Sequence, residues 1–97
     1  MGVIYTDHLR LRLKLRRFPE NYPVEIYEEP DQRFYDNLEE NFISVKKLKY
    51  NKKIRNIMIA YEKKENDIEI ITIHPIKDEQ IINRVINKRW TKNEKTI

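Results

Sequence analysis

The stretch Asp67–Pro75 limits what this chain can fold into more than any other part of it. It reads Asp-Ile-Glu-Ile-Ile-Thr-Ile-His-Pro, the most apolar run in the sequence. β-Branched residues favour strands, and proline is excluded from the interior of a paired strand. We therefore expect the central strand of a small sheet, with side chains alternating between its two faces. The expected faces are Ile68, Ile70, Thr72 and His74 on one side, and Ile71 and Ile73 on the other.

Three helices are expected around this strand. In residues 7–17, leucines alternate with charged residues, which is the period of a strand. Leucine, arginine and lysine are nevertheless good helix formers, and no β-branched residue interrupts the run. We therefore predict a helix there, capped by Thr6 or Asp7. Glu20–Glu29 predicts a short second helix, and Asp78–Asn87 an amphipathic third helix that lies across one face of the sheet.

Three further strands are expected before the central one, at Arg33–Asp36, Asn41–Tyr50 and Ile54–Glu62. The short polar connections between them imply neighbouring antiparallel strands. The order of elements predicts a single α+β domain over residues 1–97. In it, N-terminal helices pack on an antiparallel sheet of about four strands, and a C-terminal helix follows. Trp90 is expected to close the core, and residues 91–97 to form a frayed tail.

Composition excludes several kinds of protein. The sequence has no cysteine, which rules out disulfides and thiol chemistry and fits a reducing compartment. His8 and His74 are the only histidines, so we expect neither a metal site nor a cofactor. No window is apolar enough to span a membrane, and the N-terminus lacks a hydrophobic signal segment. These features predict a cytoplasmic protein without a membrane partner.

Charge is segregated along the chain, although the net charge is only +4. Basic residues gather in 7–17, 46–55 and 88–95, whereas Glu20–Glu40 is acidic apart from one arginine. Basic blocks that folding brings together would attract a polyanion, most simply nucleic acid. The residues predicted to contact it are Lys46, Lys47, Lys49, Lys52, Lys53, Arg55 and Arg89. The alternative is a charged surface that is merely solvated.

One set of residues could carry chemistry without a metal. The only glycine is Gly2, so a glycine-rich phosphate loop is absent, and the sequence has no hydrolase motif. The remaining candidates are His8, Arg12, Arg16, Thr72 and His74. Two imidazoles could serve as base and acid for attack of an RNA 2′-hydroxyl on its phosphate, and arginines could stabilise the transition state. Alternatively, the two arginines could simply pair with acids of Glu20–Glu29.

The order and spacing of these residues resemble the DUF4258 family and its BrnT-type toxin relatives. The matching features are His8-x3-Arg12-x3-Arg16-x-Phe18, a short helix before Pro30, the Arg33–Asp36 strand, two more strands, and Ile71-Thr72-Ile73-His74-Pro75. The family is grouped with the RelE/barnase/colicin-like (BECR) ribonuclease fold, whose members are often toxins that cleave RNA without metal. The resemblance covers residues 5–76 and implies functional roles for His8, Arg12, Arg16 and Thr72.

Three positions depart from the family pattern. Arg17 stands where the family usually has glycine, Phe18 where it has an aliphatic residue, and His74 where it has tyrosine. The resemblance implies an endoribonuclease toxin with RNA as substrate, an antitoxin as partner and no cofactor. The sequence leaves open whether the chain is an enzyme, and whether it forms a homodimer. The alternatives are a non-catalytic RNA- or DNA-binding domain using the same basic surface, and a structural domain.

Overall fold

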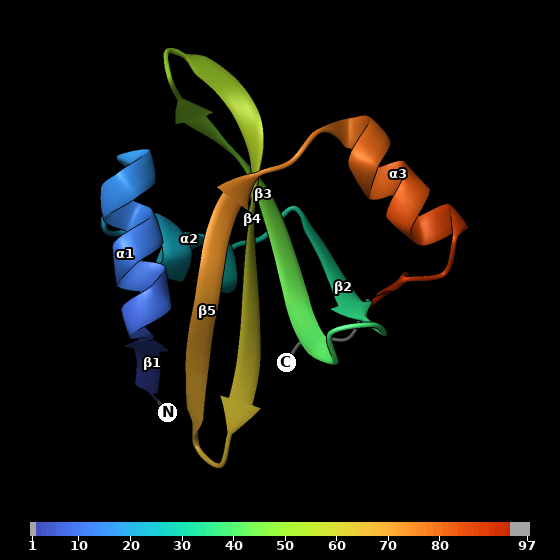
Figure 1. Ribbon diagram of the computed structural model, residues 1–97, viewed down its shortest axis with the longest axis horizontal. Coiled ribbons are helices and arrows are strands. Elements are labelled where there is room, and N and C mark those ends of the chain that lie inside the picture. The colour runs from blue at the N-terminus through green and yellow to red at the C-terminus, as the bar shows by residue number, and fades with distance from the viewer. Residues whose placement is uncertain (1, 94–97) are drawn as a thin grey trace.

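The computed structural model describes residues 2–93, which form one six-stranded sheet and three helices (Figure 1). The strands are β1 (Gly2–Tyr5), β2 (Gln32–Asp36), β3 (Asn41–Tyr50), β4 (Lys53–Lys64), β5 (Asp67–Pro75) and β6 (Trp90–Lys92). The helices are α1 (Asp7–Arg16), α2 (Tyr22–Glu28) and α3 (Asp78–Ile86). The sheet order is β1-β5-β4-β3-β2-β6, with β1 parallel to β5 and every other pair antiparallel.

The predicted α+β class is confirmed, and β2 to β5 form the expected antiparallel meander. The expected number of strands is wrong, because β1 and β6 add one strand at each edge. The prediction of a frayed tail is also wrong for Thr91 and Lys92, which pair with Tyr35 and Phe34 of β2. The Asn93 amide also donates to the Arg33 carbonyl oxygen (2.9 Å), and the last four residues of that tail, 94–97, lie outside the described residues. Short edge segments of this kind gain their strand form from a neighbour rather than from propensity.

Helix α1 forms as predicted, and its caps explain its limits. The Thr6 hydroxyl accepts a hydrogen bond from the Leu9 amide (3.1 Å), which satisfies one free donor of the first turn. At the other end, Arg17 takes a left-handed conformation (φ 56°), the conformation that glycine adopts most easily. Leu9 and Leu13 are buried, whereas the two alternating leucines between and after them are exposed. The period of two in the sequence is therefore compatible with a helix that buries every fourth residue.

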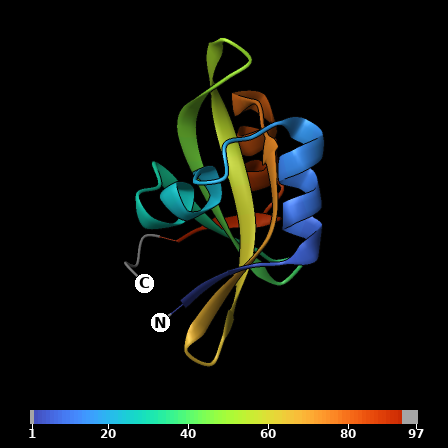
Figure 2. The ribbon, with the colours of Figure 1, turned by 90° about the vertical axis from the view of Figure 1, so that its left-hand side faces the viewer.

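One face of the sheet carries the larger core. Leu9 and Leu13 of α1 and Ile26 of α2 pack there against Ile57 and Ile59 of β4. The short helix α2 lies where the sequence predicted it. In the side view, α2 and α3 lie on opposite sides of the sheet, and α1 lies beside β5 (Figure 2). Since α1 continues directly from β1, it flanks the part of β5 that β1 does not pair.

A β-bulge changes the expected facing of side chains along β5. Pairing with β4 shifts between Ala60 and Tyr61, so that Ile70 faces Tyr61, Thr72 faces Ala60, and Ile71 has no partner. An extra residue in one strand reverses the alternation beyond it. Residues Ile68, Ile70 and Ile73 consequently belong to the larger core. The prediction that Thr72 and His74 share a face with Ile68 and Ile70 is wrong.

The other face of the sheet carries a smaller core and α3. Trp90 is buried there against Phe34 with ring centroids 5.1 Å apart, which confirms its place in the core. The prediction that the apolar side of α3 lies across the sheet is largely wrong. Only Ile81 is buried, whereas Ile82, Val85 and Ile86 are exposed. No helix within residues 2–93 is long and apolar enough to cross a bilayer.

Candidate active site

A cleft of ≈ 340 Å³ opens on the face of the sheet opposite the larger core. Its floor crosses the middle of the sheet and includes Ile43 of β3, Met58 and Ala60 of β4, and Thr72 of β5. Residues of α1 line one wall of the cleft, and residues of α3 and of the segment leading into β6 line the other. Figure 1 shows α1 and α3 on opposite sides of β5, β4 and β3. The bulge in β5 is what turns the hydroxyl and imidazole of that strand towards this cleft.

All five residues predicted to carry chemistry line this cleft: His8, Arg12, Arg16, Thr72 and His74. The first three lie at i, i+4 and i+8 on α1, so they share one side of the helix. The leucines that anchor α1 in the larger core lie at the intervening positions. Because α1 flanks the edge of β5, its two sides contribute to the core and to the cleft respectively.

His74 is partly buried at the end of β5, and its environment favours the neutral imidazole. Burial is the main cause that lowers the pKa of His74 below its ordinary value of 6.5, and the positive charges of Arg16, Arg84 and Arg12 lower it further. Its Nδ1 lies 3.1 Å from the carbonyl oxygen of Pro75, which raises this pKa in opposition. A carbonyl can only accept, so Nδ1 carries the hydrogen and Nε2 keeps its lone pair.

The α1 side of the cleft presents two arginines without carboxylate partners. Arg12 Nε donates to Nε2 of the exposed His8 (3.3 Å). Among the described residues, no carboxylate lies within 4.0 Å of the guanidinium groups of Arg12 and Arg16. The pairing with acids of the second helix that the sequence left open is not made by these two residues. Arg10, on another side of α1, forms the contact with Glu20 instead (3.8 Å).

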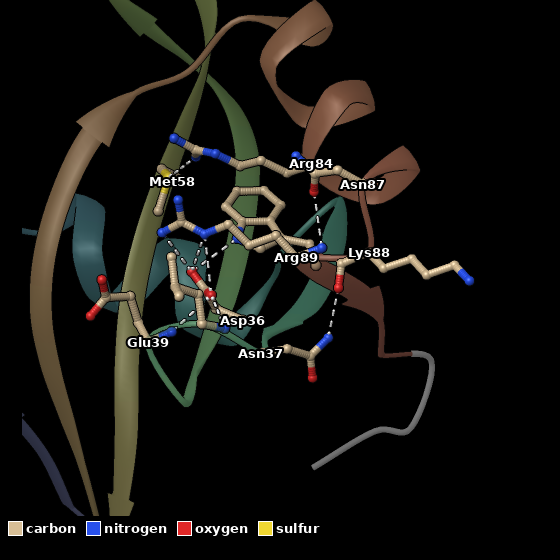
Figure 3. Close-up of polar contacts among 10 residues, drawn as sticks. Asp36, Asn37, Glu39, Met58, Arg84, Asn87, Lys88 and Arg89 are labelled. Carbon is tan, nitrogen blue, oxygen red and sulfur yellow. Dashed lines mark hydrogen bonds and ion pairs between the residues drawn. The ribbon is translucent and has the colours of Figure 1, made fainter.

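The opposite wall is built on a buried carboxylate, Asp36. It accepts from Arg89 through Nε (3.3 Å) and Nη2 (3.1 Å), and from Trp90 Nε1 (3.1 Å). The backbone amides of Leu38 and Glu39 also donate to it (2.9 and 3.1 Å). Burial on its own raises the pKa of Asp36, but these hydrogen bonds outweigh it and hold the pKa below 3.8. The charged carboxylate thus fixes Arg89 at the rim of the cleft (Figure 3).

Arg89 is the one predicted nucleic-acid contact that lines the cleft. The other six lie on the β3–β4 hairpin, which extends beyond the helices at the top of Figure 1: Lys46, Lys47, Lys49, Lys52, Lys53 and Arg55. Asn51 and Lys52 both have positive φ (51° and 66°) at its tip, so the turn forms without the glycine that usually favours it. None of these six residues lines the cleft.

Sequence reasoning missed Asp36, Glu39 and Arg84 as cleft residues. No signal in the sequence pointed to Arg84, because it lies beside Ile81 but away from the apolar side formed by Ile82, Val85 and Ile86, which was expected to pack on the sheet. Asp36 gave no signal, because its partners follow it by more than fifty positions. No group of acids and histidines in residues 2–93 could hold a metal ion.

Fold and cleft together define an α+β protein with a site of arginines and a neutral histidine. The chain matches no protein-family model, and neither a curated protein nor a solved structure matches it. The likeness to the DUF4258 and BrnT-type proteins therefore rests on the spacing of residues His8, Arg12, Arg16 and Thr72 and stays a prediction.

Proposed function

We propose that this protein is a metal-independent endoribonuclease that acts at the cleft between α1 and α3. The observation that carries the proposal is the position of His74, whose neutral form is favoured, in a cleft where Arg12 and Arg16 have no carboxylate partner within residues 2–93. A neutral imidazole next to bound phosphate is suited to take a proton from a neighbouring hydroxyl. The guanidinium groups are suited to bind the phosphate and the charge that develops on it.

The proposed reaction is an internal transfer within RNA. His74 Nε2 removes the 2′-hydroxyl proton while its Nδ1–H stays bonded to the Pro75 carbonyl oxygen. The 2′-oxygen forms a bond to phosphorus, and the bond from phosphorus to the 5′-oxygen breaks. Arg12 and Arg16 stabilise the charge on the phosphoryl oxygens, and the Thr72 hydroxyl is a further donor to them. The products are a 2′,3′-cyclic phosphate and a 5′-hydroxyl.

His8 is the proposed acid that protonates the leaving 5′-oxygen. In the free protein its Nε2 accepts a hydrogen bond from Arg12 Nε (3.3 Å). When phosphate draws the Arg12 guanidinium away, His8 Nε2 becomes free to bind a proton and then donate it. His8 takes this proton from water and gives it to the 5′-oxygen, while His74 takes the proton of the 2′-hydroxyl. After the cyclic phosphate and the 5′-hydroxyl leave, His74 returns its proton to water, so no net proton is gained or lost.

We further propose that the nuclease acts in the cytoplasm as the toxin of a toxin–antitoxin pair. Support comes from the spacing of His8, Arg12 and Arg16 and from the resemblance built on it. A cognate antitoxin would carry acidic residues where it meets this basic cleft, since charge complementarity steers such association. Growth arrest on expression in a bacterial host, relieved in a His8→Ala/His74→Ala variant, is the expected cellular result.

RNA cleavage in the presence of EDTA tests the nuclease directly. The wild-type protein should give 2′,3′-cyclic phosphate ends, and a single 2′-deoxy substitution should block the bond beside it. His74→Ala and Arg12→Ala should each lower the rate by about 100-fold or more. Arg10→Ala, an exposed arginine outside the cleft, is the matched control. Intact RNA at a large excess of wild-type protein would count against the proposal.

The second candidate is a non-catalytic RNA- or DNA-binding domain, favoured by the basic hairpin. Lys47, Lys49, Lys52, Lys53 and Arg55 are exposed, and within residues 2–93 none of them forms an ion pair. Such a surface predicts binding that weakens by about tenfold or more over a modest rise in salt if several phosphates are contacted. Binding that persists in His74→Ala without any cleavage by the wild type would support this function.

A further inference from the structure

Arg84 lies in the cleft on the wall opposite α1. It belongs to α3, one turn after Ile81, which is the residue that anchors this helix in the smaller core. In Figure 3, Arg84 reaches from α3 towards Met58 on the floor of the cleft. Its Nη1 lies 4.0 Å from the Met58 sulfur, and its Cζ lies 4.9 Å from the centroid of the Trp90 ring. The guanidinium is thus held over the floor by contacts that leave most of its N–H donors free.

The charge of Arg84 has no counter-ion in the part of the chain that the structure describes. Among the described residues, no carboxylate lies within 4.0 Å of its guanidinium. Burial lowers the pKa of Arg84 and the charge of Arg89 lowers it further, with Asp36 acting in the opposite sense. A partly desolvated cation is unfavourable unless a partner compensates it. Arg84 is therefore placed to gain from an anion that enters the cleft.

Arg89, on the same wall, differs from Arg84 in having a carboxylate partner. Its Nε and Nη2 both donate to the buried carboxylate of Asp36. That carboxylate compensates its charge and occupies one side of its planar fork. The two arginines lie near each other, and of the two only Arg84 is without a carboxylate partner among residues 2–93. Of the two, Arg84 is the stronger candidate for binding an incoming anion.

Arg84 also lies close to the imidazole of the cleft. Met58, which its guanidinium contacts, is the direct partner of His74 in the pairing of β4 with β5. Directly paired residues have Cβ atoms about 5 Å apart on the same face of a sheet. The positive charge of Arg84 accordingly acts on His74, as do those of Arg16 and Arg12 from α1. Cations from both walls converge on this one group.

We propose that Arg84 is a third phosphate-binding residue of the cleft and contacts the scissile phosphate from the side opposite Arg12 and Arg16. The identity of the anion as an RNA phosphodiester rests on the proposed function. Binding from both walls would hold different phosphoryl oxygens in place and so set the line of attack by the 2′-oxygen. The site thus consists of residues from α1, β5 and α3, and α3 is required for catalysis as well as for the fold.

Arg84→Met tests this role, because methionine keeps an apolar chain against Trp90 and Met58 but removes the charge. The matched control is Arg10→Met, which makes the same change at a residue 60% exposed outside the cleft. Inorganic phosphate is titrated into each protein while the His74 ring signals are followed by NMR. Phosphate should bind about tenfold or more weaker to Arg84→Met than to the wild type, and equally to Arg10→Met. Single-turnover RNA cleavage should fall about 100-fold in Arg84→Met only.

Several outcomes separate this inference from the nuclease proposal. Equal phosphate binding by wild type and Arg84→Met overturns the role of Arg84, and so does a wild type whose His74 signals do not respond to phosphate. Arg84-dependent phosphate binding by a wild type that leaves RNA intact supports the anion site and defeats the nuclease. If Arg84→Met does not fold by circular dichroism, Arg84→Lys is used, which keeps the charge but loses the fork. It should weaken phosphate binding severalfold, and wild-type affinity in it would overturn the inference.

Discussion

Replacing Asp36 should destabilise the fold more than replacing any surface acid. Its carboxylate is 3% exposed and accepts from Arg89, Trp90 and the amides of Leu38 and Glu39. Removing one member of a buried ion pair costs about 3–5 kcal/mol, because the partner is left uncompensated. Arg89 is 32% exposed and can turn towards water, so we expect the lower end, about 3 kcal/mol for Asp36→Ala. Asp36→Asn keeps an acceptor and should cost about half as much.

Urea unfolding followed by tryptophan fluorescence measures this loss, since Trp90 is the only tryptophan and contacts the mutated group. Glu62→Gln is the control, because Glu62 forms only an exposed pair with Lys64 (3.5 Å) and should change stability by less than about 1 kcal/mol. A loss below about 1 kcal/mol in Asp36→Ala would refute the view that this carboxylate holds the wall of the cleft.

The stability of the wild type should also depend on Asp36 in acid. The pKa of this group lies below 3.8 in the folded protein, so the unfolded chain takes up its proton first as the pH falls. The contribution of the charged Asp36 to the free energy of unfolding is complete above about pH 4, and it is lost as the pH falls through the pKa of Asp36 in the folded state. Asp36→Asn should therefore show a smaller loss of stability over this range than the wild type.

Three more outcomes are expected from single substitutions. Arg17→Gly should raise the free energy of unfolding by about 1 kcal/mol in urea titration, because position 17 has a φ of 56°, and a decrease would contradict this. Leu13→Ala should lower the free energy of unfolding by about 2–5 kcal/mol, because Leu13 is buried. Leu15 is 68% exposed, so Leu15→Ala should change it by less than about 0.5 kcal/mol. Equal losses in the two variants would show that α1 buries another side. The pKa of His74 in the folded protein is lowered from 6.5. The contribution of the neutral imidazole to the free energy of unfolding is therefore complete above about pH 6.5, and it is lost as the pH falls through the pKa of the folded state. His74→Gln should reduce that loss in melts at about pH 7.5 and about pH 5, and an unchanged loss would argue against a buried neutral His74.

The elements with strong local signals were predictable from the sequence. Helix α1 has a hydroxyl cap at Thr6 and a run of good helix formers, and these outweighed a period of two in its leucines. The long strands β3 and β4 begin and end within a few residues of their predicted limits. Grouping His8, Arg12 and Arg16 on one side of α1 needed only the geometry of a helix. The nuclease hypothesis requires them to lie close to Thr72 and His74, and in the structure all five residues line one cleft.

Features that depend on distant partners were not predictable. The bulge at Ile71 arises from the pairing of β5 with β4, and nothing within β5 itself marks it. Strand β6 exists because β2 offers it an open edge. Exposure of Ile82, Val85 and Ile86 reflects where α3 stands relative to the sheet, which its own amphipathic pattern does not fix. The buried Asp36 required knowledge of residues that follow it by more than fifty positions.

Helix α1 brings scaffold and chemistry together within ten residues. Leu9 follows His8 and Leu13 follows Arg12, yet both leucines pack in the larger core while His8 and Arg12 line the cleft. Substitutions in the polar set can therefore accumulate without disturbing the hydrophobic set. A lineage of such chains could change its ligand while keeping its shape. An insertion or deletion within the helix would instead disrupt both sets at once, so descendants should differ here by replacement and not by length.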